Sequence, residues 1–205
     1  MEVAIVDYKA GNIYSVIHAL ERLGIKPVLT DDPEIISKAD KVLFPGQGEA
    51  RQAMQQLRSR GLDKVICELQ QPILGICIGQ QLMCRHSDEG DTECLGIFDI
   101  DVKRFQPQRH EDKVPHMGWN SLRFTQGEGL RVKDKGLFKG FKGGEFVYFV
   151  HSFYVPECPW TIATTDYIQP FSAALHRDNF YATQFHPEKS GSVGERILHN
   201  FLNLS

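Results

Sequence analysis

Short apolar runs alternate with amphipathic segments along the first half of the chain. The runs at residues 3–6, 27–30, 41–45 and 73–78 are rich in branched apolar side chains and are predicted to be strands. The segment that Gly11 and Asn12 open carries apolar residues at helical spacing, and residues 50–57 form a second predicted helix. Strands that alternate with helices predict a parallel sheet with helices on both faces.

The second half of the chain has a different pattern. From Leu95 to Asn179 the apolar runs are short, aromatic and separated by Gly and Pro, which is typical of antiparallel hairpins. The predicted strands here are residues 146–150, 160–163 and 180–185, glycines 127, 129, 136, 140, 143 and 144 are expected in turns, and residues 193–204 are predicted to be a helix. We therefore expect an α/β fold, with a mostly parallel central sheet and a hairpin-rich second half, in a single domain over residues 1–205.

Charge and cysteine content narrow the class of protein. The net charge is −3, so we expect no nucleic-acid partner and no binding to an anionic membrane surface. No apolar run approaches the roughly 20 residues that span a bilayer, and the N-terminus lacks the pattern of a secretory signal. Five cysteines without a regular framework favour a reducing compartment, and we expect a cytoplasmic protein.

One predicted strand ends by placing a cysteine between two glycines. Cys77 lies between Gly75 and Gly79, and Gln80 begins a segment that is predicted to be helical. Glycines on either side of such a strand-to-helix turn relieve crowding, as in the nucleophile elbow that usually carries serine. A buried cysteine taken alone is more often a small core residue, so Cys77 needs a partner to be a nucleophile.

A histidine in the C-terminal part of the chain is the best candidate for that partner. Of the eight histidines, His186 follows the predicted strand that ends at Phe185, and Pro187 favours an extended backbone at His186. Glu188 can turn back and accept a hydrogen bond from the ring. Cys77, His186 and Glu188 then form a predicted nucleophile, base and orienting group.

Attack on an amide also requires donors for an oxyanion. Gly46, Gln47 and Gly48 follow the strand at residues 41–45 and should emerge at the same sheet edge as Cys77. We expect their backbone amides, with that of Ile78, to form an oxyanion hole.

Metal and cofactor chemistry have little support in the sequence. A zinc site made of Cys77, Cys84, His86 and Cys94 would lack a close Cys-x-x-Cys pair. We expect neither a metal nor a cofactor, and we expect Cys67, Cys84, Cys94 and Cys158 to be packing residues.

Together the Gly-Ile-Cys-Ile-Gly elbow, the Pro-Gly-Gln-Gly loop and the His-Pro-Glu stretch resemble the class I glutamine amidotransferase family. The resemblance implies a flavodoxin-like fold and the hydrolysis of L-glutamine through a thioester on Cys77. It implies a substrate-binding role for Gln81, which could also be an ordinary polar residue of a first helical turn. His151, Ser152 and Phe153 are further candidates for binding glutamine. Phe149, His151 and Tyr154 could line the glutamine site or simply be strand residues.

The ammonia that such an enzyme releases must be used elsewhere, and we expect the acceptor site on another chain. The stretches at residues 7–12 (followed by Ser15), 114–120 and 149–153 resemble the glutaminase subunits of the histidine pathway, whose partner is a cyclase subunit built as a (β/α)8 barrel. This implies a heterodimer. Met117, Trp119 and Asn120 are its candidate interface, although Trp119 could instead pack in the core.

Two alternatives remain open. Gln47 stands where this subfamily usually has a small apolar residue, so a non-catalytic regulatory subunit on the same scaffold is one alternative. The glutaminase subunit of a different ammonia-using synthase is the other.

Overall fold

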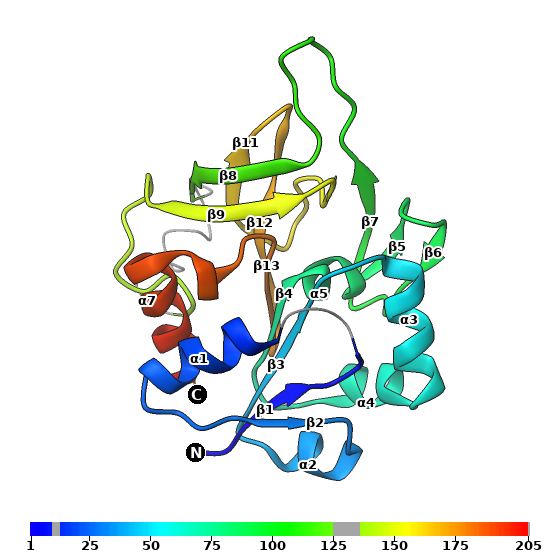
Figure 1. Cartoon of the computed structure of the whole chain (residues 1–205), viewed down its shortest axis with the longest axis vertical. Helices are drawn as coiled ribbons and strands as arrows, with labels where there is room; N and C mark the ends of the chain where they lie inside the picture. The colour runs from blue at the N-terminus through cyan, green and yellow to red at the C-terminus, as the bar shows by residue number, and fades with distance from the viewer. Residues whose placement is uncertain (10–12, 125–135, 205) are drawn as a thin grey trace.

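A seven-stranded sheet forms the centre of the molecule, whose computed structural model describes residues 1–9, 13–124 and 136–204 (Figure 1). The sheet has the order β11-β12-β13-β4-β3-β1-β2. Its strands are β1 (Val3–Val6), β2 (Val28–Thr30), β3 (Lys41–Gly46), β4 (Ile73–Cys77), β11 (Thr161–Asp166), β12 (Pro170–Arg177) and β13 (Phe180–Thr183).

Four neighbouring strand pairs of this sheet are parallel and two are antiparallel. β2, β1, β3, β4 and β13 run parallel, whereas β12 pairs antiparallel with both β13 and β11. The order 2-1-3-4 is that of flavodoxin-like sheets. The predicted mostly parallel sheet is confirmed, with corrections at two strand ends: β13 ends at Thr183 and not at Phe185, and β4 ends at Cys77, so that Ile78 belongs to a helix. Thr183 pairs with Ile76, and the next residue of β4 is Cys77, where that strand turns away.

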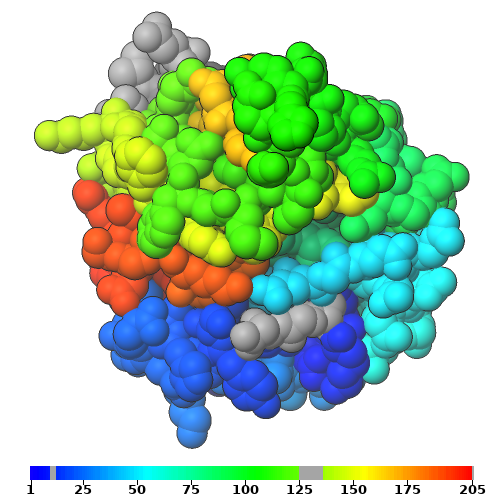
Figure 2. Space-filling model, turned by 45° about the horizontal axis from the view of Figure 1, so that its top comes forward, coloured from blue at the N-terminus to red at the C-terminus, as the bar shows by residue number. Residues whose placement is uncertain are grey.

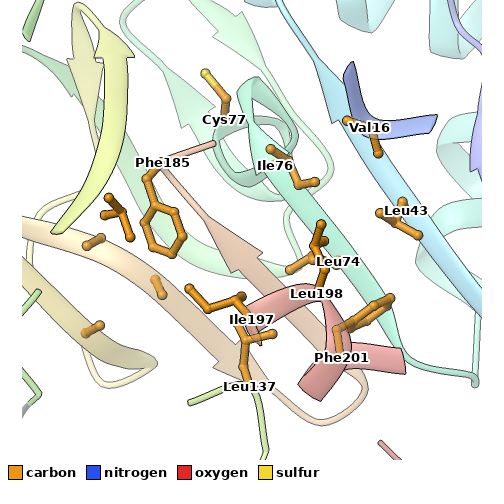
Figure 3. Packing of buried hydrophobic residues seen from close by; sticks show 14 of the residues in the cluster. Val16, Leu43, Leu74, Ile76, Cys77, Leu137, Phe185, Ile197, Leu198 and Phe201 are labelled. Atoms are coloured by element: carbon orange, nitrogen blue, oxygen red, sulfur yellow. The ribbon is translucent and has the colours of Figure 1, made fainter. Parts of the chain in front are cut away.

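Helices cover both faces of the sheet, as the alternation predicted. On one face lie α1 (Tyr14–Arg22) and α7 (Gly191–Leu202), and on the other lie α2 (Pro33–Lys38), α3 (Ala50–Ser59), α4 (Leu62–Glu68) and α5 (Ile78–Leu82) (Figure 1). Figure 3 shows Ile197 and Phe201 of α7 beside Leu74 of β4, with Cys77 beyond the apolar residues at the end of that strand. Helices α2 and α4 are short and were not predicted.

The buried strands divide their side chains between the two layers. Val3 and Ile5 of β1 belong to the core beneath α1 and α7, whereas Ala4 and Val6 belong to the core beneath α2 to α5. Because successive side chains of a strand point to opposite faces, a strand covered on both faces must be apolar throughout. This requirement explains the unbroken apolar runs of the first half.

Two smaller sheets lie beyond the carboxyl ends of the central strands. One contains β5 (Cys84–Ser87), β6 (Thr92–Glu93), β7 (Phe98–Arg104) and β10 (Phe153–Tyr154), and the other pairs β8 (His116–Ser121) with β9 (Phe146–His151). The hairpin-rich second half is thus confirmed. Figure 2 shows a hollow between the green and yellow residues of the β8–β9 region and the cyan residues that follow β3.

Glycines at 136, 140, 143 and 144 have positive φ values, as expected for turns. Glycines 127 and 129, and the predicted helix opening at Gly11 and Asn12, lie outside the described residues. Within the described ranges, no helix combines the length and apolarity that a membrane crossing requires.

The turn after β4 depends on close backbone contacts. A Cβ atom on Gly79 would overlap the carbonyl oxygen of Phe44 in β3, and one on Gly75 would lie 2.9 Å from the carbonyl carbon of Gly79. Helix α5 can therefore approach the sheet only because these two positions lack side chains.

We expect Gly79→Ala to lower the free energy of unfolding by about 1–3 kcal/mol, because the added methyl group forces α5 away from β3. Denaturant unfolding measures this change. Gly24→Ala is the comparison variant. Its added methyl group would meet no atom within 4 Å, so any loss of stability in that variant comes from its φ of 77° and not from a steric clash. Equal stability of Gly79→Ala and the unmodified chain would contradict the close approach.

Candidate active site

Cys77 occupies a sharp turn between β4 and α5. Its φ is 56° and its ψ is −108°, and α5 begins at the next residue, Ile78. Gly46, the last residue of β3, is its register partner. A Cβ on Gly46 would overlap the Tyr8 hydroxyl and lie 2.6 Å from Ile78 Cγ2, so glycine allows the end of β3 to lie beside the turn. The sequence pattern of glycines around the cysteine thus corresponds to a strained strand-to-helix turn.

His186 and Glu188 form a buried pair. The His186 Nδ1 atom lies 2.7 Å from Glu188 Oε1, and both side chains are almost fully buried. An ionised carboxylate only accepts hydrogen bonds, so Nδ1 donates and Nε2 is left for another partner. Within the described part of the chain, Nε2 makes no hydrogen bond.

Backbone contacts hold this pair against β9. The His186 N–H donates to the Tyr148 carbonyl over 2.9 Å, and the Tyr148 N–H donates to Ser190 Oγ over 2.9 Å. Glu188 lies in the 3-10 helix η1 (Pro187–Lys189), which begins directly after His186. The backbone of His186 is extended, as Pro187 predicted.

The charge of His186 is set by its neighbours. Burial lowers the pKa of His186, but the Cys77 sulfur and the Glu188 carboxylate outweigh burial and raise this pKa to about 10. The imidazole is therefore a cation at neutral pH. A cation beside the sulfur stabilises a thiolate, which is the nucleophilic form of cysteine.

A cavity of about 490 Å³ collects most of the predicted residues. Its walls include Gln47, Gly48, Cys77, Ile78, Gln81, His151, Ser152, Phe153 and His186. Two of the residues predicted for catalysis or the oxyanion hole, Gly46 and Glu188, are not in its walls and instead border a much smaller space. Gly46 is therefore better understood as a spacer that brings Gln47 and Gly48 to the site.

Gln81 lies in the wall of the cavity and is only 4% exposed. Its Nε2 atom donates to the Phe153 carbonyl over 3.0 Å and to Gln184 Oε1 over 2.9 Å. Since both amide hydrogens are used, the side-chain oxygen is the group left for a ligand. These contacts distinguish Gln81 from a solvent-facing residue of a first helical turn.

Several wall residues were missed by the sequence analysis. They are Glu89, Pro115, Tyr148, Val150 and Lys189. Glu89 illustrates why: its carboxylate accepts from the Ala50 N–H over 2.9 Å at the start of α3, which is a contact between distant segments. Burial raises the pKa of Glu89. No local pattern in the sequence identifies such a residue.

The candidate interface residues lie on β8. Met117 is 63% exposed and Trp119 is 55% exposed, so the alternative that Trp119 packs in the core is wrong. Asn120 is half-buried, and its side chain donates to the Asp166 carbonyl over 2.8 Å. Asn120 therefore supports the strand from within the chain, and the exposed apolar surface is that of Met117 and Trp119.

The remaining cysteines differ in exposure. Cys84 is buried as expected for a packing residue, whereas Cys67 is exposed, which corrects that expectation for Cys67. Within residues 1–9, 13–124 and 136–204, no group of three or more His, Cys, Asp or Glu side chains is placed to hold a metal ion.

Comparisons with known proteins identify the family of this chain. The family described as glutamine amidotransferase class-I matches residues 4–204. A protein from Bacteroides thetaiotaomicron named imidazole glycerol phosphate synthase subunit HisH is 63% identical over 204 residues, which cover 100% of both chains. The protein of that name from Escherichia coli strain K12 is 43% identical over 205 residues, again 100% of both chains.

Solved structures share the fold. The crystal structure of a glutamine amidotransferase has a TM-score of 0.72 at 18% identity, and the match covers 98% of this chain and 97% of that one. A glutamine amidotransferase from Thermotoga maritima has a TM-score of 0.60 at 15% identity, covering 99% and 83%. With the family match over almost its whole length and full-length relatives at high identity, the chain belongs to the class I glutamine amidotransferase family.

Proposed function

We propose that this chain is the glutaminase subunit of an imidazole glycerol phosphate synthase and supplies ammonia for histidine biosynthesis. The observation that carries the proposal is the 63% identity to a protein of that name over the full length of both chains. The substrate is L-glutamine and the products are glutamate and ammonia. The enzyme acts in the cytoplasm, where reducing conditions keep the Cys77 thiol free.

The first chemical step uses Cys77 and His186. The Cys77 thiolate attacks the side-chain carbonyl carbon of glutamine, and His186 Nε2 donates its proton to the departing amide nitrogen. The carbon–nitrogen bond breaks, ammonia leaves, and a γ-glutamyl thioester remains on Cys77. Water then attacks the thioester while His186 accepts a proton from it, which releases glutamate. The hydrogen bond from Nδ1 to Glu188 keeps Nε2 directed to the reaction in both steps.

Backbone amides stabilise the oxyanion that each attack creates. Ile78 begins α5 directly after the nucleophile, and Gln47 and Gly48 border the same cavity. Gly48 has a φ of 116°, a conformation that favours glycine, so this loop depends on its glycine to present its amides. The side chain of Gln47 does not prevent a backbone amide from donating.

The charge state of the pair can be measured directly. The folded-state pKa of His186 is raised from 6.5 to about 10, so its pairing with Cys77 and Glu188 stabilises the folded state. This contribution to the free energy of unfolding is complete below pH 6.5 and is lost as the pH rises through about 10. An NMR titration of the ring nitrogens should show the cation well above pH 7. Glu188→Gln and Cys77→Ala should each lower the midpoint; a midpoint near 6.5 in all three proteins would contradict the ion-pair arrangement.

The ammonia acceptor lies on a partner, which we propose is a cyclase subunit built as a (β/α)8 barrel, giving a heterodimer. Met117 and Trp119 on β8 form the partner-facing surface. Exposed aromatic and Met side chains are enriched in the centres of protein interfaces. Pro115, just before β8, borders the cavity, so a partner docked there would lie close to the site of ammonia release.

The test of the proposed function is glutamate release from glutamine by the purified chain, alone and with a cyclase subunit that carries its nucleotide ligand. We expect the partner to increase the rate and Cys77→Ala to abolish it without weakening the complex. Release that depends on Cys77 but ignores the cyclase would assign the chain to a different synthase. An unchanged rate in Cys77→Ala would reject the thiol mechanism.

We expect Trp119→Ala to weaken binding of the cyclase subunit by about tenfold or more, because an exposed aromatic anchor is lost. Titration calorimetry measures the binding. Ile35→Ala is the matched control, since Ile35 is exposed on α2, a helix that packs against β1 and α4 rather than β8. Undiminished binding by Trp119→Ala would place the interface elsewhere.

A further inference from the structure

A chain of hydrogen bonds joins strand β8 to the active-site cavity through side chains that the proposed mechanism does not use. The Asn120 side-chain nitrogen lies 3.4 Å from His116 Nε2. His116 Nδ1 lies 3.1 Å from His151 Nε2, and His151 Nδ1 lies 2.7 Å from the Phe153 carbonyl oxygen. His116 and His151 are both buried.

The Phe153 carbonyl oxygen, at one end of these hydrogen bonds, determines which ring nitrogen donates and which accepts in each of them. A carbonyl oxygen only accepts, so His151 Nδ1 carries the hydrogen and His151 Nε2 accepts from His116 Nδ1. His116 Nε2 then accepts from Asn120. Burial lowers the pKa of His151 to about 3, with help from His116 and His186, and lowers the pKa of His116 to about 4. Both rings are neutral at pH 7, and each has one donor and one acceptor in use.

The chain continues from the Phe153 carbonyl to the sulfur. Gln81 Nε2 donates to that carbonyl over 3.0 Å and to Gln184 Oε1 over 2.9 Å. The Gln184 side-chain nitrogen donates to Cys77 Sγ over 3.8 Å. Gln184 is completely buried, and its own N–H donates to the Ala173 carbonyl over 2.9 Å. Because Gln81 occupies the oxygen of the Gln184 amide, the nitrogen of that amide is turned to the sulfur.

We propose that Gln184 is a positioning residue for the nucleophile: its amide holds the Cys77 thiolate by a hydrogen bond, and the chain through Gln81, His151 and His116 to Asn120 fixes that amide. A hydrogen bond to an ionised acceptor is stronger than one between neutral groups, so the contact favours the thiolate over the thiol. The proposal rests on the proposed role of Cys77 as nucleophile. It adds a second source of thiolate stabilisation to His186.

Two titratable groups interact with the sulfur, and of these only His186 carries a charge that favours the thiolate. His186 faces Cys77 from the segment after β13, and Tyr8 faces it from the end of β1. Burial, with a smaller effect of Cys77, raises the pKa of Tyr8, so its hydroxyl stays neutral. Among the described residues, the Tyr8 hydroxyl makes no hydrogen bond.

The test is the rate at which iodoacetamide alkylates Cys77 at pH 7 in the full chain, measured by mass spectrometry. Cys67 is exposed and serves as the internal reference in every sample. We expect Gln184→Leu to slow alkylation of Cys77 by about tenfold and to leave Cys67 unchanged. Gln80→Leu is the matched control, because this buried amide donates to the Ser172 carbonyl and not to the sulfur.

A second variant tests the part of the hydrogen-bond chain that lies farthest from the sulfur. His116 stacks on Phe149 and Tyr167, with ring centroids 4.8 Å and 3.9 Å apart, so His116→Phe keeps the packing and removes the hydrogen bonds. We expect it to slow alkylation of Cys77 by about threefold, an effect smaller than the loss of a direct bond. Misfolding would be visible at Cys84, which is buried and would be alkylated faster if the fold opened, so the expected result is slower alkylation of Cys77 with no change at Cys84.

The outcomes separate the two proposals. Equal Cys77 rates in Gln184→Leu and the unmodified chain would overturn the positioning role and leave the triad intact. Slower alkylation in Gln184→Leu with no change in His116→Phe would overturn the role of the hydrogen bonds through His116. A Cys77 that reacts no faster than Cys67 in the unmodified protein would instead contradict the proposed nucleophile.

Discussion

Cys77 has a φ of 56° and a ψ of −108°, a conformation that costs a residue with a side chain about 1–3 kcal/mol, so the packing around it must hold it in place. That packing comes from close backbone approach. Gly79 lies against the Phe44 carbonyl, Gly75 lies against Gly79, and β4 is paired on both sides, with β3 and β13. The turn ends β4 and starts α5 within one residue. Its result is that Cys77 and Ile78 both line the cavity.

Three buried histidines near this turn differ in charge because their neighbours differ. His186 lies beside the Glu188 carboxylate and the Cys77 sulfur, and these raise its pKa to about 10 despite burial. His151 and His116 lie beside each other and beside aromatic rings, and burial lowers their pKa values to about 3 and about 4. The site thus combines one cationic ring, which favours a thiolate, with two neutral rings that form hydrogen bonds between Asn120 on β8 and the Phe153 carbonyl. The same residue type serves both purposes because desolvation acts on every buried ring and only one ring has anionic partners.

Local patterns made the centre of the site predictable. The glycines around Cys77 and the Pro187 after His186 act on the backbone within a few residues, so the sequence alone indicates the turn and the extended histidine. Short elements with weak patterns, such as α2 and α4, escaped prediction, and β13 proved two residues shorter because β4 turns away. Gln184 could not be identified as a contact of the sulfur, since its orientation depends on Gln81, 103 positions earlier. The exposure of Trp119 depends on tertiary packing and was equally undetermined.

The central claim is that Cys77 forms the covalent intermediate. The most direct test is to mix the chain and its cyclase partner with glutamine, quench the reaction in acid within milliseconds to seconds, and locate any added mass by peptide mass spectrometry. We expect a γ-glutamyl group on the peptide that contains Cys77, present during turnover and absent when glutamine is consumed. Glutamate release during turnover with no adduct on Cys77, or an adduct on a different residue, would contradict the account.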